Sequence, residues 1–309
     1  MRDVIPVYRK KDTLLQELHP ATQLALICSL LILSLVAKNP LYQVAVIAAT
    51  AILSASADVA VEWWSWWKLC LVIGLAALII NPLVSRMGAT VIWRGPHVPV
   101  LGRLDITLEA VAYGAGMALR LAAVIWVFAL LSLIMDPDRA LGLLKGKGSR
   151  SALASALALR MVPTAMRDSV AILDAQRARG VAKDEGGKLR VLGSRFPLMK
   201  RLVSTSLDRG IGLAESMESR AYGSHRRTRL VEFRFGAGDV IVVLLAGALL
   251  GAGLVGIAGG GAPFTYYPSL SAPVSMWTAV FAALPVVIAL IILALSKWWK
   301  RWTWLKLRT

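Results

Sequence analysis

The sequence contains few acidic residues, few histidines and few cysteines. Its 309 residues include 18 Asp and Glu against 35 Lys and Arg, with three histidines and two cysteines. The histidines are scattered, and no His-x3-His or Cys-x2-Cys pair occurs, so a metal site is not expected. Cys28 and Cys70 lie in or beside apolar segments. We interpret them as small buried hydrophobic residues rather than as a disulfide.

A phosphate-binding loop is also missing. The nearest segment, Gly142–Ser149, lacks the Gly-x4-Gly-Lys-Ser/Thr spacing that places a lysine and a hydroxyl on phosphates, and we interpret it as a flexible basic turn. Asp136 and Asp138 flank Pro137 and could form an acid/base pair, but a helix stop followed by a solvated turn is the simpler interpretation. No catalytic residue and no cofactor is predicted, and the chain is not expected to be an enzyme.

Apolar residues dominate what is present. They make up 57% of the chain, the mean hydropathy is +0.64, and only 17% of residues are charged, against about 25% in a soluble domain. The apolar runs approach the roughly 20 residues that a helix needs to cross a bilayer, and they are continuous rather than alternating. The sequence therefore predicts an all-α polytopic membrane protein. The net charge of +17 is better explained by cytoplasmic loops than by nucleic-acid binding.

Six transmembrane helices and three regions are predicted. The spans are Leu24–Ala37, Leu41–Ala57, Leu69–Ile80, Ile106–Met135, Val240–Ile257 and Trp277–Leu295. Four of them belong to an N-terminal bundle, residues 1–135, and two belong to residues 236–309, which end in a basic tail. Between these regions lies a basic cytoplasmic segment, residues 136–235.

Two connections and the orientation follow from composition. Asp58–Lys68 carries four tryptophans and is predicted to be an interfacial elbow, whereas residues 85–105 are rich in Gly and Pro and indicate an irregular loop. Lys and Arg gather in the N-terminus, the elbow, the middle segment and the tail, while the opposite side receives few. The positive-inside rule places both termini in the cytoplasm, and no cleavable signal pattern is evident.

The basic middle segment predicts two amphipathic helices. Ser151–Ala178 is rich in helix-forming residues, with Pro163 expected to bend or break it near Arg160. A second helix is predicted from Pro197 to Ser219. The intervening Ala182–Arg195 contains an Asp-Glu-Gly-Gly sequence and indicates a mobile linker. Two such helices suit a membrane surface or the docking of a partner.

Both predicted helices end in an arginine among small residues. The first ends in Ala178-Arg179-Gly180 and the second in Ser219-Arg220-Ala221, followed by Gly223. Arginine in a last turn and glycine just beyond it are ordinary helix caps, and one occurrence would be interpreted so. Two occurrences in one segment favour a second interpretation, in which each arginine enters a groove on a partner and pairs with a carboxylate.

Several motifs in order resemble the T component of energy-coupling factor (ECF) transporters, the transmembrane scaffold of vitamin and metal-ion importers. They begin with the entry motif, Leu18–Leu24, and continue with Met135–Arg139 and Leu159–Pro163 before the two arginine-containing ends. The resemblance implies that Arg179 and Arg220 each insert into one of two ATP-binding cassette ATPase subunits, and that a separate membrane subunit binds the substrate. It also implies the plasma membrane of a prokaryote.

The sequence departs from that family in two places. The second helix end reads Ser-Arg-Ala instead of Ala-Arg-Gly, and the entry motif has Ala21 and Gln23 where basic residues are usual. The small neighbours of Arg220 remain, so docking is still expected.

Two ionisable residues lie in the long fourth span. Glu109 is near a helix start and can favour the dipole there, while Arg120 is deeper and is a candidate functional residue. A stand-alone secondary transporter is the main alternative function, although broken helices and midplane charges are otherwise few. A lipid-modifying membrane enzyme would have to rely on Asp136 and Asp138.

Overall fold

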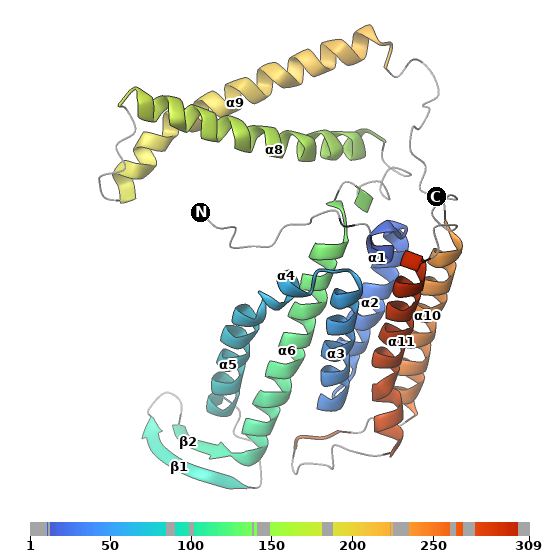
Figure 1. The fold of residues 1–309 in the computed structure, drawn as a ribbon. Helices are drawn as coiled ribbons and strands as arrows, with labels where there is room; N and C mark the ends of the chain where they lie inside the picture. The colour runs from blue at the N-terminus through green and yellow to red at the C-terminus, as the bar shows by residue number, and fades with distance from the viewer. Residues whose placement is uncertain are drawn as a thin grey trace. The chain divides into compact units, whose positions relative to one another are not determined.

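The computed structural model divides the chain into two compact units (Figure 1). One unit comprises Met1–Ala140 and Phe233–Thr309, and the other comprises Leu141–Glu232. The structure describes residues 11, 13–84, 90–98, 102–137, 139–140, 149–180, 188–222, 224, 235–259, 264–267 and 276–301.

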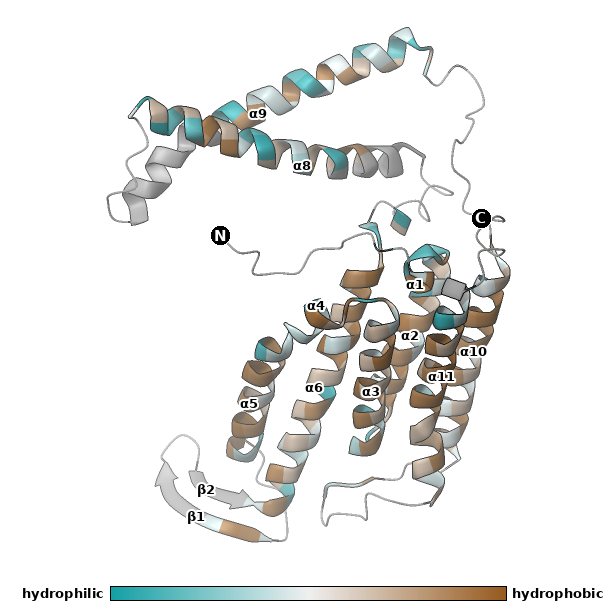
Figure 2. Ribbon diagram, viewed as in Figure 1, coloured by the Kyte–Doolittle hydropathy of each residue, from teal (hydrophilic) through white to brown (hydrophobic). Residues whose placement is uncertain are grey.

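The first unit is a helical bundle. Its helices are α1 (Leu14–Glu17), α2 (Pro20–Val36), α3 (Pro40–Ser56), α4 (Ala60–Trp64), α5 (Trp67–Val84), α6 (Leu108–Ile134), α10 (Ala237–Ala258) and α11 (Met276–Arg301). Six of these are apolar, four of them long and two shorter, and they overlap the six predicted spans (Figure 2). The all-α membrane class is therefore confirmed.

The apolar helices differ in length. Four candidate spans, Ala60–Val84, Leu108–Ile134, Ala237–Ala258 and Met276–Trp298, are long and apolar enough to cross a membrane. The other two, α2 and α3, have 17 residues each, which gives a length of about 25 Å. This is near the lower limit for a span. Each begins with a proline, and the side chains of His19 and Asn39 accept hydrogen bonds from the first turns.

The core of this bundle is formed where α3 packs against α6 and α11, and α2 against α6 and α10. Tyr42, Leu30, Leu130 and Ile292 are fully buried there. Helix α5 packs mainly on α6, its neighbour in Figure 1. Most of its apolar side chains are exposed. Such exposure suits a helix whose outer surface meets lipid.

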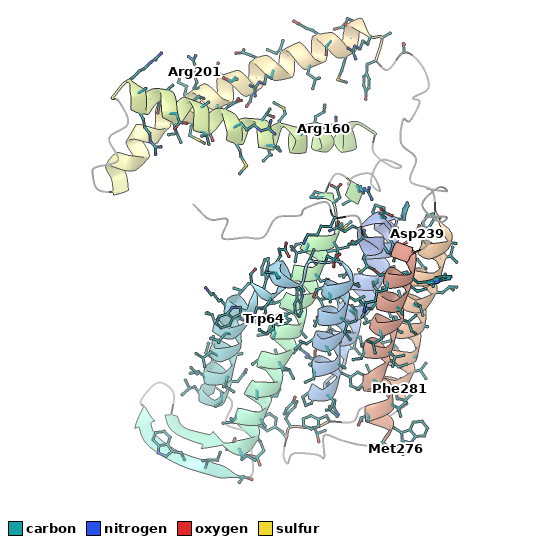
Figure 3. All side chains as sticks on the ribbon, viewed as in Figure 1. Trp64, Arg160, Arg201, Asp239, Met276 and Phe281 are labelled. Carbon is teal, nitrogen blue, oxygen red and sulfur yellow. The ribbon has the colours of Figure 1, made fainter. Side chains whose placement is uncertain are left out.

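The entry motif joins the ends of several helices. The backbone N–H of His19 donates to Asp239 Oδ1 at 2.7 Å, and Asp239 Oδ2 accepts from Gly236 N–H at 2.9 Å. Gln23 Nε2 donates to the Leu15 carbonyl at 2.6 Å. Asp239 is labelled in Figure 3, at the start of α10. The motif therefore fixes α2 to α1 and α10.

The prediction of an irregular loop at residues 85–105 is wrong for most of that segment. β1 (Val91–Val98) and β2 (Gly102–Thr107) form an antiparallel hairpin, paired from Val91↔Thr107 to Val98↔Gly102. Two register shifts separate Val91 from Trp93 and Arg94 from His97. The second shift contains Gly95 and Pro96, the residues that had indicated a loop. A bulge thus accommodates turn residues within a paired strand.

One of the four elbow tryptophans belongs to the core rather than to the interface. Trp63 is buried, and its Nε1 donates to the Trp126 carbonyl at 3.1 Å. The two indole rings meet edge to face with centroids 3.9 Å apart. Trp64, which is labelled in Figure 3, is exposed, and so is Trp67, as a headgroup-level position requires.

The second unit contains α8 (Ser149–Ala178) and α9 (Lys188–Ser219). Helix α8 continues through Pro163 without a break, which leaves a bend as the remaining part of that prediction. The Thr164 hydroxyl donates to the carbonyls of Arg160 and Met161. Helix α9 begins nine residues earlier than predicted, so 188–195 is helical rather than linker. Residues 182–187, the rest of that linker, lie outside the described ranges.

Candidate partner-docking site

Helix α8 ends in a glycine-capped turn. Gly180 has φ +70°, and its N–H donates to the Arg177 carbonyl at 3.0 Å. The N–H of Arg179 still reaches back to Ala175 at 3.2 Å. Arg179 is therefore the last residue before the chain turns left-handed, and its side chain is exposed. Glycine adopts this conformation without steric cost.

Helix α9 ends in the same way with a different residue. Ala221 has φ +54°, its N–H donates to the Glu218 carbonyl at 2.8 Å, and Tyr222 N–H donates to the Met217 carbonyl at 2.9 Å. This pair of bonds defines a Schellman cap. The sequence had indicated Gly223 as the capping residue, but the left-handed residue is Ala221, and Gly223 lies outside the described part of the chain. An alanine there is strained by roughly 1 kcal/mol or more.

The two ends are equivalent position by position. In each, a small residue (Ala178 or Ser219) closes the helix, an arginine follows, and the next residue is left-handed. All of these residues are exposed. Neither Arg179 nor Arg220 bonds through its guanidinium to another described residue. Both guanidinium groups are thus available to a carboxylate on another molecule.

A charged pair joins the two helices where they cross. Arg209 of α9 contacts both carboxylate oxygens of Asp168 of α8, with Nη2 to Oδ1 at 3.2 Å. This hydrogen bonding raises the pKa of the Arg209 guanidinium. The pair was not predicted, although an acidic residue on one amphipathic helix and a basic one on the other was a usable signal. Arg179 and Arg220 are not brought together, because they lie at opposite ends of the crossed helices (Figure 1).

Apolar side chains form two exposed rows on the crossed pair. They recur every four residues, which places each row along one face of its helix. The rows are Val162, Met166 and Val170 on α8, and Met199, Val203, Leu207 and Ile211 on α9. Each of these side chains is at least half exposed, and none of the described side chains in this unit is fully buried.

A groove lies beside Arg220. Its volume is about 660 Å³, and its lining includes Leu157 from α8 with Leu213, Met217 and Tyr222 from the end of α9. Glu218 also contributes to it. Sequence patterns did not predict this groove, because it depends on where the start of α8 lies against the end of α9. It gives the second arginine an apolar neighbourhood suited to a partner side chain.

Arg120 has a structural partner in the bundle. Its Nη2 donates to the Ala37 carbonyl at 2.7 Å, at the C-terminal end of α2. Because α2 is short, its negative end meets α6 part of the way along that longer helix, where a cation is favourable. Arg120 belongs to the bundle unit and not to the docking ends. Its depth in the predicted span is thereby explained.

Glu109 also has partners. It is buried, and its carboxylate accepts from the Thr90 backbone N–H at 3.1 Å and from the Thr90 hydroxyl at 2.9 Å. Glu109 therefore fixes the start of the hairpin to the first turn of α6.

The described residues do not gather three or more His, Cys, Asp or Glu side chains in a metal-binding arrangement. Asp136 pairs with Arg139 at 3.9 Å, and Arg139 Nη1 also donates to the Gln16 carbonyl at 3.0 Å. Asp138, the other member of the possible acid/base pair, lies outside the described ranges, as does the glycine-rich segment 141–148. The sequence lacks any phosphate-loop spacing.

Known proteins of similar sequence carry consistent names. The cobalt transport protein (CbiQ) family matches residues 11–230. An energy-coupling factor transporter transmembrane protein, EcfT, of Thermosediminibacter oceani is 32% identical over 57% of this chain and 71% of its own length. The EcfT protein of Ruminiclostridium cellulolyticum is 30% identical over 78% of this chain and 92% of its own length. That of Lactococcus lactis is 29% identical over 53% and 68%.

The fold defines a polytopic all-α membrane protein with a crossed pair of amphipathic helices. The family match spans most of the sequence. The similarity to the Ruminiclostridium cellulolyticum protein extends over 92% of that protein's length. The chain belongs to the cobalt transport protein (CbiQ) family, and its resemblance to T components of ECF transporters is confirmed.

Proposed function

We propose that the chain is the transmembrane scaffold and coupling subunit of an ECF-type ABC importer. Two separate ATPase subunits dock on it, one at Ala178-Arg179-Gly180 and the other at Ser219-Arg220-Ala221. Their ATP-driven movement passes through α8 and α9 to a separate membrane subunit that binds a vitamin or a metal ion. The free energy comes from nucleotide binding and hydrolysis in the partners, because a coupling element shifts an equilibrium only by what its ligands supply.

One observation carries this proposal. Two successive helices of one unit present an exposed arginine at the same capping position, and in each case the backbone turns left-handed immediately afterwards. A glycine cap accounts for the turn after Arg179, but Arg220 occupies the same position in front of an alanine, Ala221. The names of the relatives support the same assignment.

The location is part of the proposal. Lys and Arg concentrate in the segment that contains α8 and α9 and near both termini, which supports a cytoplasmic position for all three. We place the bundle in the plasma (inner) membrane of a prokaryote, with ATP hydrolysis assigned to the partner chains because this sequence has no nucleotide-binding loop.

The test is co-purification with the ATPase subunits encoded beside this chain. Arg179→Glu and Arg220→Glu should each lower recovery of the ATPases, and the double variant should abolish it, since each variant reverses the charge at one docking end. Arg160→Glu on α8 and Arg201→Glu on α9 are matched controls, because both arginines are exposed and lie away from the helix ends (Figure 3). Recovery in the controls should equal wild type.

Two results would overturn the assignment. Equal recovery of ATPases with wild type and the double variant would leave the arginines as helix caps only. Substrate uptake by liposomes that contain this chain alone would instead identify a stand-alone secondary transporter.

A further inference from the structure

A second cavity lies within the membrane bundle. Its volume is about 340 Å³, which is enough for a small ligand or a headgroup. It is bounded by the turn between α2 and α3, by one face of α6, and by the segment 264–267 that follows α10. Two cations, Lys38 and Arg120, line it together with the aromatic residues Tyr113, Phe264, Tyr266 and Tyr267.

Among the described residues, the positive charge of this cavity has no acidic side chain paired with it. Neither Lys38 nor Arg120 forms an ion pair with a described residue. The two connecting segments at the cavity, 37–39 and 259–275, contain no Asp or Glu in the sequence. At the same end of the bundle, residues 85–109 contain two acidic residues, Asp105 and Glu109, and the Glu109 carboxylate accepts hydrogen bonds from Thr90.

The cations retain bonding capacity. Arg120 donates one bond, from Nη2 to the Ala37 carbonyl at 2.7 Å, and a guanidinium carries five N–H donors. Lys38 accepts at its backbone carbonyl from the Tyr266 hydroxyl at 3.4 Å, which leaves its ammonium group uninvolved in that contact. The cap that Arg120 provides for the end of α2 uses one of its N–H donors. It does not account for the presence of Lys38 in the same cavity.

The aromatic wall is preformed. Tyr266 meets Tyr113 and Phe264 edge to face, with ring centroids 5.3 and 4.6 Å apart. Tyr266 also lies directly against Gly116 of α6, where an added Cβ would stand 2.0 Å from the Tyr266 hydroxyl oxygen. A glycine at position 116 is thus required for the ring to reach α6. The wall places phenol groups next to the cations.

We propose that this cavity binds a phosphate group, carried either by the headgroup of an anionic phospholipid or by a small soluble molecule. Arginine presents a planar fork that matches phosphate oxygens, and lysine adds a compact positive charge. The tyrosine hydroxyls provide further donors. Two cations that form no ion pair with a described residue favour a group that carries one or two negative charges and several acceptor oxygens. The proposal is independent of ATPase docking, since it rests on the bundle alone.

The experiment uses the full chain in nanodiscs of phosphatidylcholine. Phosphatidylglycerol is added at a few mole per cent, and native mass spectrometry counts the molecules retained by each chain. Inorganic phosphate is titrated separately by calorimetry. Wild type should bind one of the two probes in a 1:1 ratio. Lys38→Gln and Arg120→Gln should each weaken that binding about tenfold or more, because each removes a charge-assisted bond.

Matched variants separate binding from folding. Lys68→Gln removes an exposed lysine that does not line the cavity, and Gly251→Ala adds a methyl group in open space. Both should bind as wild type does, whereas Gly116→Ala should displace Tyr266 and weaken binding. If Arg120→Gln fails to fold because α2 loses its cap, Lys38→Gln and Tyr266→Phe still test the site.

Each result is decisive. Retention of phosphatidylglycerol without phosphate binding identifies a lipid headgroup, and phosphate binding in phosphatidylcholine alone identifies a soluble ligand. Failure of wild type to bind either probe, or equal binding by wild type, Lys38→Gln and Gly116→Ala, would overturn the proposal.

Discussion

The membrane bundle and the crossed helices are stabilised in different ways. In the bundle, side chains such as Tyr42, Leu130 and Ile292 are fully buried between helices that are distant in sequence. In the crossed pair, by contrast, all described side chains keep some exposure, and the main specific contact is the pair Arg209–Asp168. The bundle has an interior of its own, whereas the pair mainly presents surface.

Exposed apolar side chains have different energetic consequences in the two units. Exposed apolar residues on α5 are favourable where lipid tails surround the helix. The rows on α8 and α9 belong to a polar, basic segment, and each exposed square ångström of apolar surface in water costs about 25 cal/mol. The comparison therefore favours coverage of these rows in the assembled transporter, as the proposed function requires.

The largest difference should appear when one leucine is shortened in each unit. Leu130 is 0% exposed and Leu207 is 62% exposed. Leu130→Ala leaves a cavity among packed helices and should lower the free energy of unfolding by about 2–5 kcal/mol, while Leu207→Ala should change it by less than about 0.5 kcal/mol. Unfolding of the purified chain in mixed micelles measures both.

Leu207→Ala has a second readout that sharpens the contrast. If a partner covers the row that contains Leu207 in the assembled complex, Leu207→Ala removes part of that contact. Recovery of the partner in co-purification should then fall. Equal destabilisation of the isolated chain by both variants would show that the crossed pair has a packed interior after all.

Exchanging glycine and alanine at the left-handed position should lower the stability of the end of α8 and raise that of the end of α9. Gly180→Ala places a Cβ at φ +70° and should destabilise the end of α8 by about 1 kcal/mol, whereas Ala221→Gly relieves strain at φ +54° and should stabilise the end of α9 by a similar amount. Hydrogen exchange of the last-turn amides measures each change.

Gly210→Ala is the control for this pair of substitutions. Gly210 lies inside α9, without a positive φ and with open space at the Cβ position, so alanine should strengthen the helix. Destabilisation of α9 by Ala221→Gly would show that its cap does not adopt the left-handed turn.

The smallest effect is expected at the crossing. Asp168→Asn removes the charge that Arg209 contacts while keeping the shape of the side chain. The isolated chain should lose little stability, because exposed ion pairs contribute weakly. The distribution of distances between spin labels on α8 and α9 should nevertheless broaden. An unchanged distribution would mean that apolar contacts alone fix the crossing.

The apolar helices and the amphipathic pair could be predicted because their signals are local and periodic. Long runs such as that of α6 specify a span directly, and Pro40 marks the start of α3. The similarity of the helix ends at Arg179 and Arg220 could also be predicted, since each helix cap depends on a few neighbouring residues. ATPase docking at these ends remains a prediction.

The features that were missed depend on tertiary context. The hairpin at 91–107 tolerates Gly95 and Pro96 by a register shift that no local pattern reveals. The left-handed role of Ala221 contradicts the ordinary preference for glycine, so Gly223 was the better guess from sequence. The cavity around Arg120 requires the end of α2, the middle of α6 and residues 264–267 to meet, although 144 or more residues separate Arg120 from the last of these.

The contact between α8 and α9 lies at the same distance from the arginine at the end of each helix. Asp168 lies eleven residues before Arg179, and Arg209 lies eleven residues before Arg220. Each of the two terminal arginines is therefore about 16 Å along its helix from the contact between Asp168 and Arg209. Neither stretch contains a proline or a break. A rotation of about 10° at the crossing would therefore shift each tip by roughly 3 Å. In the proposed coupling, such a rotation would move the two docking arginines by equal distances.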